Sequence, residues 1–487
     1  MIERAYKQNK INSIVNKINS NTKVMKHIFL MSLIMAAFAA PSTHAQINEY
    51  KPDAETVLRL IRNDKLELVL PGAMRDNKID MWIHVARAGN PDPLEYEFGT
   101  IDGYLIFTDT GDRIERAMFG GIFTGSGGVE NIDVYGSTEV ARAIGGYDPF
   151  NVDISVYDEI RDFVEARDPK TIAVNFSDWL AVADGISHTQ YLKLEKILGS
   201  KYAARIVSSE NLVTDFRSTR ILREVAVQTN TLEIARQNAF KNLSKIVPGR
   251  TTIGECQCDA RVLYSATAKQ PDQPRATGWI RDRDYVLQRG DFISFSGNAK
   301  WMDFGFSSFG VDTKQHAYIL REGETSVPKS LQYAWEQTKK AQGIMRKHVK
   351  VGMTAGESYK AIIVAMEKEG FIHTPFNDDS AEDYRIIQKY LKGIGNKKSG
   401  FYFDFHAMGN NGGDLVTVGS SMADFRRDRD HLVIKVNHIF AFEYAVHTNL
   451  PERPGFPMTI NFSNPQAVTN LGVEWIQPAN DKIHLVH

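Results

Sequence analysis

Residues 246–255 read Ile-Val-Pro-Gly-Arg-Thr-Thr-Ile-Gly-Glu, and residues 349–357 read Val-Lys-Val-Gly-Met-Thr-Ala-Gly-Glu. In both stretches a glycine is placed to end one helix, and a Thr-x-x-Glu capping box to begin the next. A long predicted helix precedes each stretch, at 218–246 and 328–347. An apolar strand region follows each one, at 285–295 and 431–444. Two helix–helix–strand units in the same order predict a domain with pseudo-two-fold symmetry.

The chain before this domain alternates between helical and strand patterns. A helix is predicted over 54–63, followed by a strand at 66–70 that Pro71 and Gly72 end. Apolar runs at 104–108 and 113–119 predict a hairpin. The pattern continues with predicted helices and strands at 156–166, 171–175, 191–198 and 204–207. This alternation predicts an α/β domain.

The first 45 residues differ from the rest. Lys26 precedes an apolar run over 28–40, and small residues stand at Thr43 and Ala45, which is the pattern of a secretory signal peptide cleaved before Gln46. A helix over this run rises about 20 Å, whereas a bilayer core is about 30 Å thick. We therefore expect export to the periplasm or the extracellular space and no stable membrane span, with a membrane anchor as the alternative if cleavage fails.

Residues 1–24 fit no export pattern, so either the chain starts at Met25 or it carries a long basic leader. Its length suits two domains, which we place at 46–215 and 216–487 after a leader and signal peptide at 1–45. Without the leader, 52 Lys and Arg stand against 58 Asp and Glu, a net charge of −6. This mild acidity argues against a nucleic-acid partner.

The chain has two cysteines, Cys256 and Cys258, with one residue between them. So close a pair bridges poorly. We expect two small side chains in a helix, with no disulfide and no metal or redox role.

Four motifs in order give the sequence a resemblance to a known family. They are the 246–255 stretch, the strand entry Arg289-Gly290-Asp291, the strand Phe442-Glu443-Tyr444 and the closing run at 467–475. Together they resemble the pita-bread fold of the creatinase/aminopeptidase P metallopeptidases. Over residues 50–487 the resemblance implies an α/β (α+β) protein: a creatinase-like α/β domain, then a pita-bread domain with a curved antiparallel sheet. It also implies homodimers and an aminopeptidase that removes the residue before proline from peptides.

Peptidases of this family hold two divalent metals with five side chains, in the order Asp, Asp, His, Glu, Glu. Asp312, His406 and Glu443 stand at three of these positions, and Ser296 and Ser463 at the first and last. Serine hydroxyls are neutral, poor ligands, so two carboxylates are lost. The resemblance therefore implies one divalent ion (Mn²⁺, Co²⁺, Fe²⁺ or Zn²⁺) or none.

Three further positions bear on this site. Asp303, nine residues before Asp312, either takes over the first ligand role or is a solvated loop residue. Gly413 stands where the family has a second, substrate-facing histidine, and Glu474 is expected to be a surface charge. Glu443 lies between aromatic residues, where a carboxylate is costly to bury without a metal or a cation.

Three functions stay open at this point, and the family resemblance favours the first, with the other two as alternatives. The first is an exopeptidase with one metal held by Asp312, His406 and Glu443, whose hydroxide attacks the peptide carbonyl. The second is a pseudopeptidase that binds peptides without cleaving them. The third is a metal-free hydrolase of the creatinase kind, with His406 as its catalytic general base.

Overall fold

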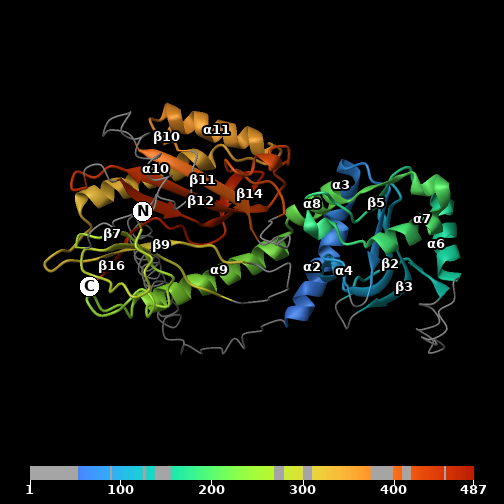
Figure 1. Cartoon of the computed structure of the whole chain (residues 1–487), viewed down its shortest axis with the longest axis horizontal. Coiled ribbons are helices and arrows are strands. Elements are labelled where there is room, and N and C mark those ends of the chain that lie inside the picture. The colour runs from blue at the N-terminus through green and yellow to red at the C-terminus, as the bar shows by residue number, and fades with distance from the viewer. Residues whose placement is uncertain are drawn as a thin grey trace, which may run out of the picture. The chain divides into compact units, whose positions relative to one another are not determined.

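The computed structural model describes residues 53–87, 90–123, 128–137, 155–267, 279–299, 310–374, 399–408, 418–453 and 457–487. Residues 54–487 form one compact unit, in which helices cover β-sheets (Figure 1). The mixed α/β class expected from the sequence is confirmed. The domain division at 215/216 and the signal peptide stay predictions, the latter because residues 1–45 lie outside the described ranges. Within those ranges, no helix is both long and apolar enough to cross a membrane.

The first sheet is formed by the N-terminal strands, in a mixed parallel and antiparallel order. From edge to edge it consists of β4 (Val134–Tyr135), β3 (Ile114–Phe123), β2 (Thr100–Asp109), β1 (Met81–Ala86), β5 (Ile172–Val174) and β6 (Ile206–Ser208). The expected hairpin is confirmed as β2–β3, whereas β5 pairs in parallel with both β1 and β6. Parallel neighbours need crossover helices, and the alternating sequence pattern provides them.

Helices cover both faces of this sheet. An apolar core lies on each face of the sheet. One core includes residues from α6 (Ser155–Arg167) and α7 (His188–Ala203). The other includes residues from α2 (Ala54–Leu68), α3 (Leu70–Asp76) and α8 (Glu210–Ser218). Short helical segments lie at α4 (Glu95–Phe98) and η2 (Ala181–Ala183). The result is a three-layer arrangement.

The prediction of a strand over 66–70 is wrong. Helix α2 continues to Leu68, and α3 begins at Leu70 with Pro71 in its first turn, where a missing N–H costs nothing. Leu66, Leu70 and Met74 recur at helical spacing and are fully buried. A short apolar run cannot be assigned by periodicity alone, and here the burial of one helical face decided it.

The C-terminal strands form two further sheets. One has the order β10 (Ile372–His373), β11 (Gly400–Ala407), β12 (His438–Thr448), β14 (Pro465–Thr469), β15 (Gly472–Trp475), with β13 (Met458–Phe462) also paired to β12. The other has the order β16 (His484–Val486), β9 (Gln315–Ile319), β8 (Phe292–Phe295), β7 (Arg261–Tyr264).

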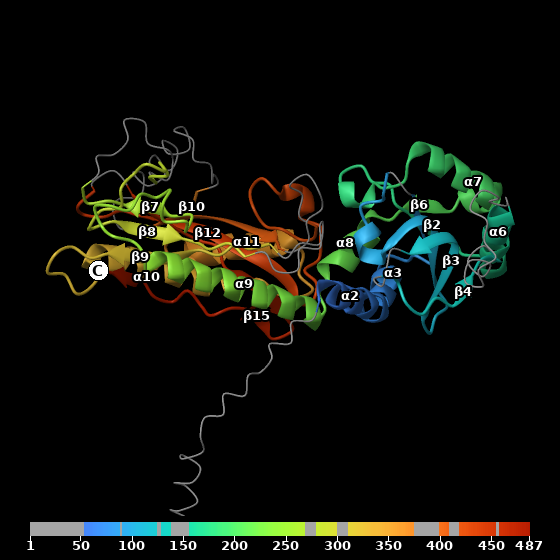
Figure 2. The ribbon, with the colours of Figure 1, turned by 90° about the horizontal axis from the view of Figure 1, so that it is seen from below.

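Three long helices pack on these sheets. Helices α10 (Lys329–Arg346) and α11 (Ala355–Lys368) share the large core with the aromatic faces of β11 and β12. Helix α9 (Leu222–Leu243) runs alongside the C-terminal sheets (Figure 2). It contributes Ala239 and Leu243 to a core with β8 and β9, and Leu232 to one with β12 and β14. A short turn, η4 (Arg427–Arg429), precedes β12.

The two capping boxes have different outcomes. Thr354 and Glu357 cap α11 reciprocally, as expected. Thr252 and Glu255 make the same two hydrogen bonds, yet only a turn follows. Gly249 and Gly352 both adopt left-handed φ values, +76° and +87°, which glycine accepts without strain. The two stretches therefore share the same capping hydrogen bonds, but only the second one begins a helix.

The expectation for the cysteines is wrong as well. Cys256 and Cys258 form a disulfide in the turn after Thr252 and are both buried. Gln257 between them has a left-handed φ of +53°, which bends the chain and places the two Cα atoms 5.2 Å apart. That separation lies within the usual range for a disulfide, about 4.4–6.8 Å.

Candidate functional site

Three strands of the C-terminal region bring together the retained ligand positions. Asp312 lies just before β9, His406 near the end of β11, and Glu443 in the middle of β12. One nitrogen or oxygen atom from each side chain lies within 4.8 Å of the others. Their side chains keep 26%, 17% and 31% of their exposure, so solvent reaches all three.

The register of β11 and β12 explains why these polar side chains share a face. Asp404 is opposite Glu443 and His406 is opposite Ala441, so all four point to the same side. The residues between them, such as Phe405 and Phe442, point into the large core instead. Because successive side chains along a strand point to opposite faces, the sheet has an aromatic face that packs against the helices and a polar face that carries the site.

A lysine occupies the centre of this site. Lys314 Nζ lies 2.8 Å from Glu443 Oε1 and 3.2 Å from Asp312 Oδ1, and the Lys314 side chain is only 12% exposed. His406 Nε2 lies 3.5 Å from Asp312 Oδ2 and 3.7 Å from Glu443 Oε2. Each carboxylate therefore has one oxygen facing the ammonium and the other facing the imidazole.

The protonation states follow from this geometry. Burial alone would lower the pKa of His406, but its contacts with Asp312 and Glu443 outweigh burial and raise the pKa to about 10. Burial would likewise lower the pKa of Lys314, and the charges of Glu443 and Asp312 raise it instead. Burial would raise the pKa of both carboxylates, but Lys314 and His406 hold these pKa values below the ordinary range. At neutral pH two cations thus face two anions.

The two serine positions lie beside the site but add no charge to it. Ser463 follows β13, whose pairing with β12 continues to a position opposite Glu443, and its hydroxyl lies 3.3 Å from the Asp312 carbonyl. Ser296 follows β8, whose pairing with β9 continues to a position opposite Lys314. Its hydroxyl donates to Asp259 Oδ2 over 3.3 Å, and Asp259 is not part of the cluster.

A two-metal centre does not fit these residues. Holding two dications close together requires several carboxylates, and among the described residues the cluster has two, both paired with Lys314. A single ion has three converging donors, but it must displace the Lys314 ammonium. Asp303 and Gly413 lie outside the described residues, and Glu474 is exposed on β15.

The sequence interpretation named Asp312, His406 and Glu443 but gave Lys314 no role. The sequence did contain a signal for Lys314. Residues two apart in an extended segment share a face, and Lys314 stands two residues after Asp312. Asp404 was also missed. It is opposite Glu443 and receives two hydrogen bonds from Arg426, at 2.7 and 3.0 Å. The same spacing marked Asp404, which stands two residues before His406 in β11, but its place opposite Glu443 depends on pairing with a distant strand.

Comparison with known proteins supports the fold. No family model matches this chain, and no curated protein matches its sequence. Among solved structures, the chain is similar to an X-Pro aminopeptidase from Thermotoga maritima MSB8, with 14% identity, a TM-score of 0.50, and coverage of 85% of this chain and 100% of that one. It also matches an Xaa-Pro dipeptidase from Bacillus anthracis, with 13% identity, a TM-score of 0.46, and coverage of 88% and 100%. The first match shows that this chain has the pita-bread fold of such enzymes.

Proposed function

We propose that this protein is an exported, peptide-binding pseudopeptidase of the creatinase/aminopeptidase P family, in which Lys314 neutralises the remnant of a metal site. The observation that carries the proposal is the position of the Lys314 ammonium, in contact with both Asp312 and Glu443. The likeness to an X-Pro aminopeptidase over 85% of the chain suggests the kind of ligand, a peptide with proline near its N-terminus.

Charge balance supports a site without metal. Asp312 and Glu443 carry two negative charges, and Lys314 and protonated His406 carry two positive ones. A divalent ion must move the ammonium away and take the proton from the imidazole. Both steps cost free energy, because they replace existing charge-assisted hydrogen bonds. The metal affinity of this site is therefore expected to be weak.

The same charges do not favour the metal-free hydrolase with His406 as general base. A base must be unprotonated at working pH, and the contacts with Asp312 and Glu443 keep His406 protonated well above neutrality. Lys314 is protonated for the same reason.

A second candidate is the exopeptidase with one metal. It is favoured by the convergence of Asp312, His406 and Glu443, whose donor atoms lie within 4.8 Å of one another. These three residues would hold Mn²⁺, Co²⁺, Fe²⁺ or Zn²⁺, which when bound would supply a positive charge for polarising a peptide carbonyl. Lys314 would then have to turn out of the site.

The deciding experiment measures metal, binding and cleavage on one preparation. Purified protein is dialysed against Mn²⁺, Co²⁺ or Zn²⁺ and analysed by elemental mass spectrometry. The tripeptide Ala-Pro-Phe is then titrated by calorimetry, and its hydrolysis is followed by chromatography. We expect binding, no cleavage and less than one metal per chain.

The alternatives give different results. One metal per chain with cleavage, both lost in His406→Ala, would establish the second candidate. Absence of peptide binding would refute both. The double variant Ser296→Asp/Ser463→Glu tests the assignment of the lost positions, because it restores two carboxylates and should raise metal uptake, most strongly when Lys314 is also replaced by methionine.

Export and dimerisation need separate tests. Expression of the full chain with its leader, followed by N-terminal sequencing of the protein outside the cytoplasm, should give Gln46 as the first residue. Sedimentation of the mature protein should give a homodimer. An uncleaved chain retained in the cytoplasm would contradict export without affecting the proposal for the site.

A further inference from the structure

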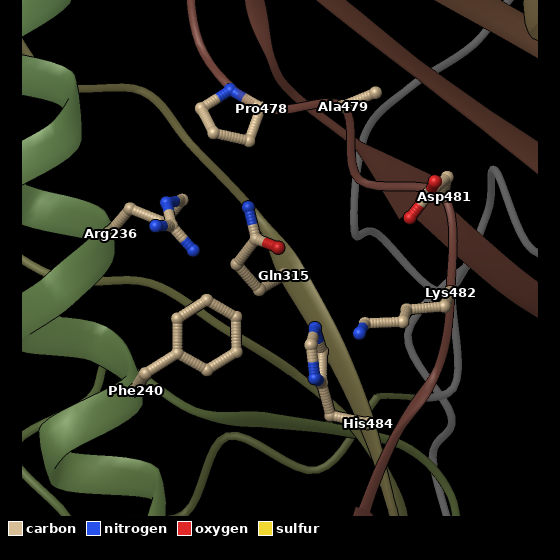
Figure 3. Close-up of a pocket in the computed structure, with 8 residues that line it drawn as sticks. All are labelled: Arg236, Phe240, Gln315, Pro478, Ala479, Asp481, Lys482 and His484. Atoms are coloured by element: carbon tan, nitrogen blue, oxygen red, sulfur yellow. The ribbon is translucent and has the colours of Figure 1, made fainter. Parts of the chain in front are cut away.

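A pocket lies away from the candidate site, between α9, β9 and the segment that leads into β16. It has a volume of 440 Å³, within the range of pockets that take small organic ligands. Figure 3 shows Arg236 and Phe240 reaching in from the helix, Gln315 rising from the strand between them, and Lys482 and His484 closing the opposite side.

The base of the pocket carries an unsatisfied donor. The Gln315 side chain belongs to a residue that is only 3% exposed, and its Nε2 has no hydrogen-bond partner among the described residues. Leaving a buried amide donor without a hydrogen bond is unfavourable, so we expect Gln315 Nε2 to meet an acceptor when a ligand is bound. The missing partner is an acceptor, since Nε2 only donates.

The groups around this amide include two cations, Arg236 and Lys482, that can add hydrogen-bond donors and local positive charge for an acceptor. Lys482 points toward the pocket from the side opposite Arg236, whose guanidinium holds Glu233 at 2.8 Å while keeping other donors (Figure 3). Two opposing charges lie nearby, Glu233 on the Arg236 guanidinium and Asp481 at the rim. The pKa of His484 reflects the balance: burial lowers it, and Lys482 and Arg236 lower it further, against a smaller effect of Asp481.

Flat apolar surfaces complete the lining. The rings of Phe240 and His484 lie edge to face with centroids 4.5 Å apart, and the Arg236 guanidinium lies 5.4 Å from the Phe240 centroid. Pro478 forms the wall above Gln315 (Figure 3). An inorganic ion would use none of these surfaces, whereas an organic body would bury apolar area against them.

We propose that this pocket binds a small organic carboxylate with an aromatic or apolar body. Its carboxylate accepts hydrogen bonds from Gln315 Nε2 and from the guanidinium of Arg236, with Lys482 adding charge, and its body packs on Phe240 and His484. Glu233 takes the Nε and Nη2 donors of Arg236. A planar two-oxygen acceptor can therefore meet Gln315 Nε2 with one oxygen and the Nη1 side of the guanidinium with the other.

The pocket is separate from the candidate site but adjoins it along the chain, because Lys314 immediately precedes β9 and Gln315 begins it. Lys314 and Gln315 are consecutive, so their side chains leave the chain on opposite faces. The segment that lines the pocket is fixed to this strand by Asn480, whose Nδ2 donates to the Lys314 carbonyl over 2.8 Å. Binding here neither requires nor excludes a peptide at the candidate site.

The test uses phenylacetate as the probe, phenylacetamide as its neutral counterpart and inorganic phosphate as the anion without an apolar body. Calorimetry and saturation-transfer NMR on the full-length protein measure binding. We expect phenylacetate to bind with a Kd of about 1 mM or below, and the amide at least about tenfold more weakly. Phosphate should bind more weakly than phenylacetate, and its equal binding would indicate an adventitious ion only and overturn the proposal.

Variants locate the binding. Gln315→Glu keeps the shape of the side chain and places a negative charge at the base, so phenylacetate binding should be lost, and Arg236→Met should weaken it about tenfold. The control Lys193→Met removes an exposed lysine from α7 and should bind as the wild type does. Unchanged binding in Gln315→Glu would refute the proposal even if phenylacetate binds. Lys314→Met should retain phenylacetate binding, so failure here is distinct from failure of the proposed function.

Discussion

Replacing Lys314 by methionine (Lys314→Met) removes the charge at the centre of the candidate site while keeping a side chain of similar length. In the native protein the ammonium lies 2.8 Å from Glu443 Oε1 and 3.2 Å from Asp312 Oδ1. After the replacement, two carboxylates face each other with His406 as their remaining partner in the cluster. The folded protein should be less stable, and the two carboxylates should become available to a metal ion.

The magnitude follows from the distances and the exposure. At an effective dielectric constant of about 20, two unit charges about 3 Å apart interact by about 5 kcal/mol before desolvation is subtracted. Removing one partner of a buried ion pair costs about 3–5 kcal/mol. Asp312 and Glu443 retain 26% and 31% of their side-chain exposure, and His406 stays as a counter-charge, both of which reduce the loss. We expect the free energy of unfolding at pH 7 to fall by about 2–3 kcal/mol.

Metal ions should reverse this loss in the variant alone. A ligand that binds only the folded state stabilises it by about 2.7 kcal/mol when present at about 100 times its Kd. Urea unfolding of the wild type and of Lys314→Met, each with chelator or with Mn²⁺ or Zn²⁺, measures both effects. We expect the metal to shift the midpoint of the variant and to leave the wild type nearly unchanged.

Lys314→Arg is the matched control, because it keeps a cation at this position. Its free energy of unfolding should fall by less than about 2–3 kcal/mol, and it should gain no metal affinity. Two results would refute the reasoning. One is a Lys314→Met protein as stable as the wild type with no added metal affinity. The other is wild-type protein that takes up one metal per chain as tightly as the variant does.

Three further predictions concern other parts of the structure. His406 has a folded-state pKa of about 10, above its ordinary value of 6.5. The stability that its protonated form contributes is therefore fully present below about pH 6.5 and is lost as the pH rises toward 10. The loss of unfolding free energy in His406→Gln, measured by urea unfolding, should shrink from pH 6 to about pH 10. A Cβ on Gly297 would lie 2.1 Å from the Ala235 carbonyl oxygen of α9, so Gly297→Ala should lower the free energy of unfolding by about 2–3 kcal/mol, and a loss under about 0.5 kcal/mol would contradict this packing. The disulfide closes a very short loop, so the double variant Cys256→Ser/Cys258→Ser should lose only about 1–2 kcal/mol in thermal or urea unfolding.

The fold was largely predictable, because its strongest sequence signals are local. Capping boxes, alternating apolar runs and the glycines at 249 and 352 depend on neighbours along the chain, and the structure confirms the hairpin β2–β3 and the long helices α9 and α10. The errors came where local signals conflict. Residues 66–70 and the turn at Cys256–Cys258 have patterns compatible with two structures, and packing or backbone conformation chose between them.

The candidate site was also predictable in part. The order of motifs along the chain was enough to select Asp312, His406 and Glu443, and the structure brings these three together. It was also enough to show that Ser296 and Ser463 contribute no charge. What fills the centre of the site depends on strand pairing, which sets residues over a hundred positions apart within hydrogen-bonding distance.

By itself the sequence determined the α/β class, and its resemblance to a metallopeptidase family implied one metal or none. It also favoured a cation or metal beside Glu443, because the neighbouring aromatic residues predicted a buried carboxylate. Only the tertiary structure decided that Lys314 is that cation. The reason is geometric: β9, β11 and β12 converge so that one ammonium group reaches both remaining carboxylates, at 2.8 and 3.2 Å.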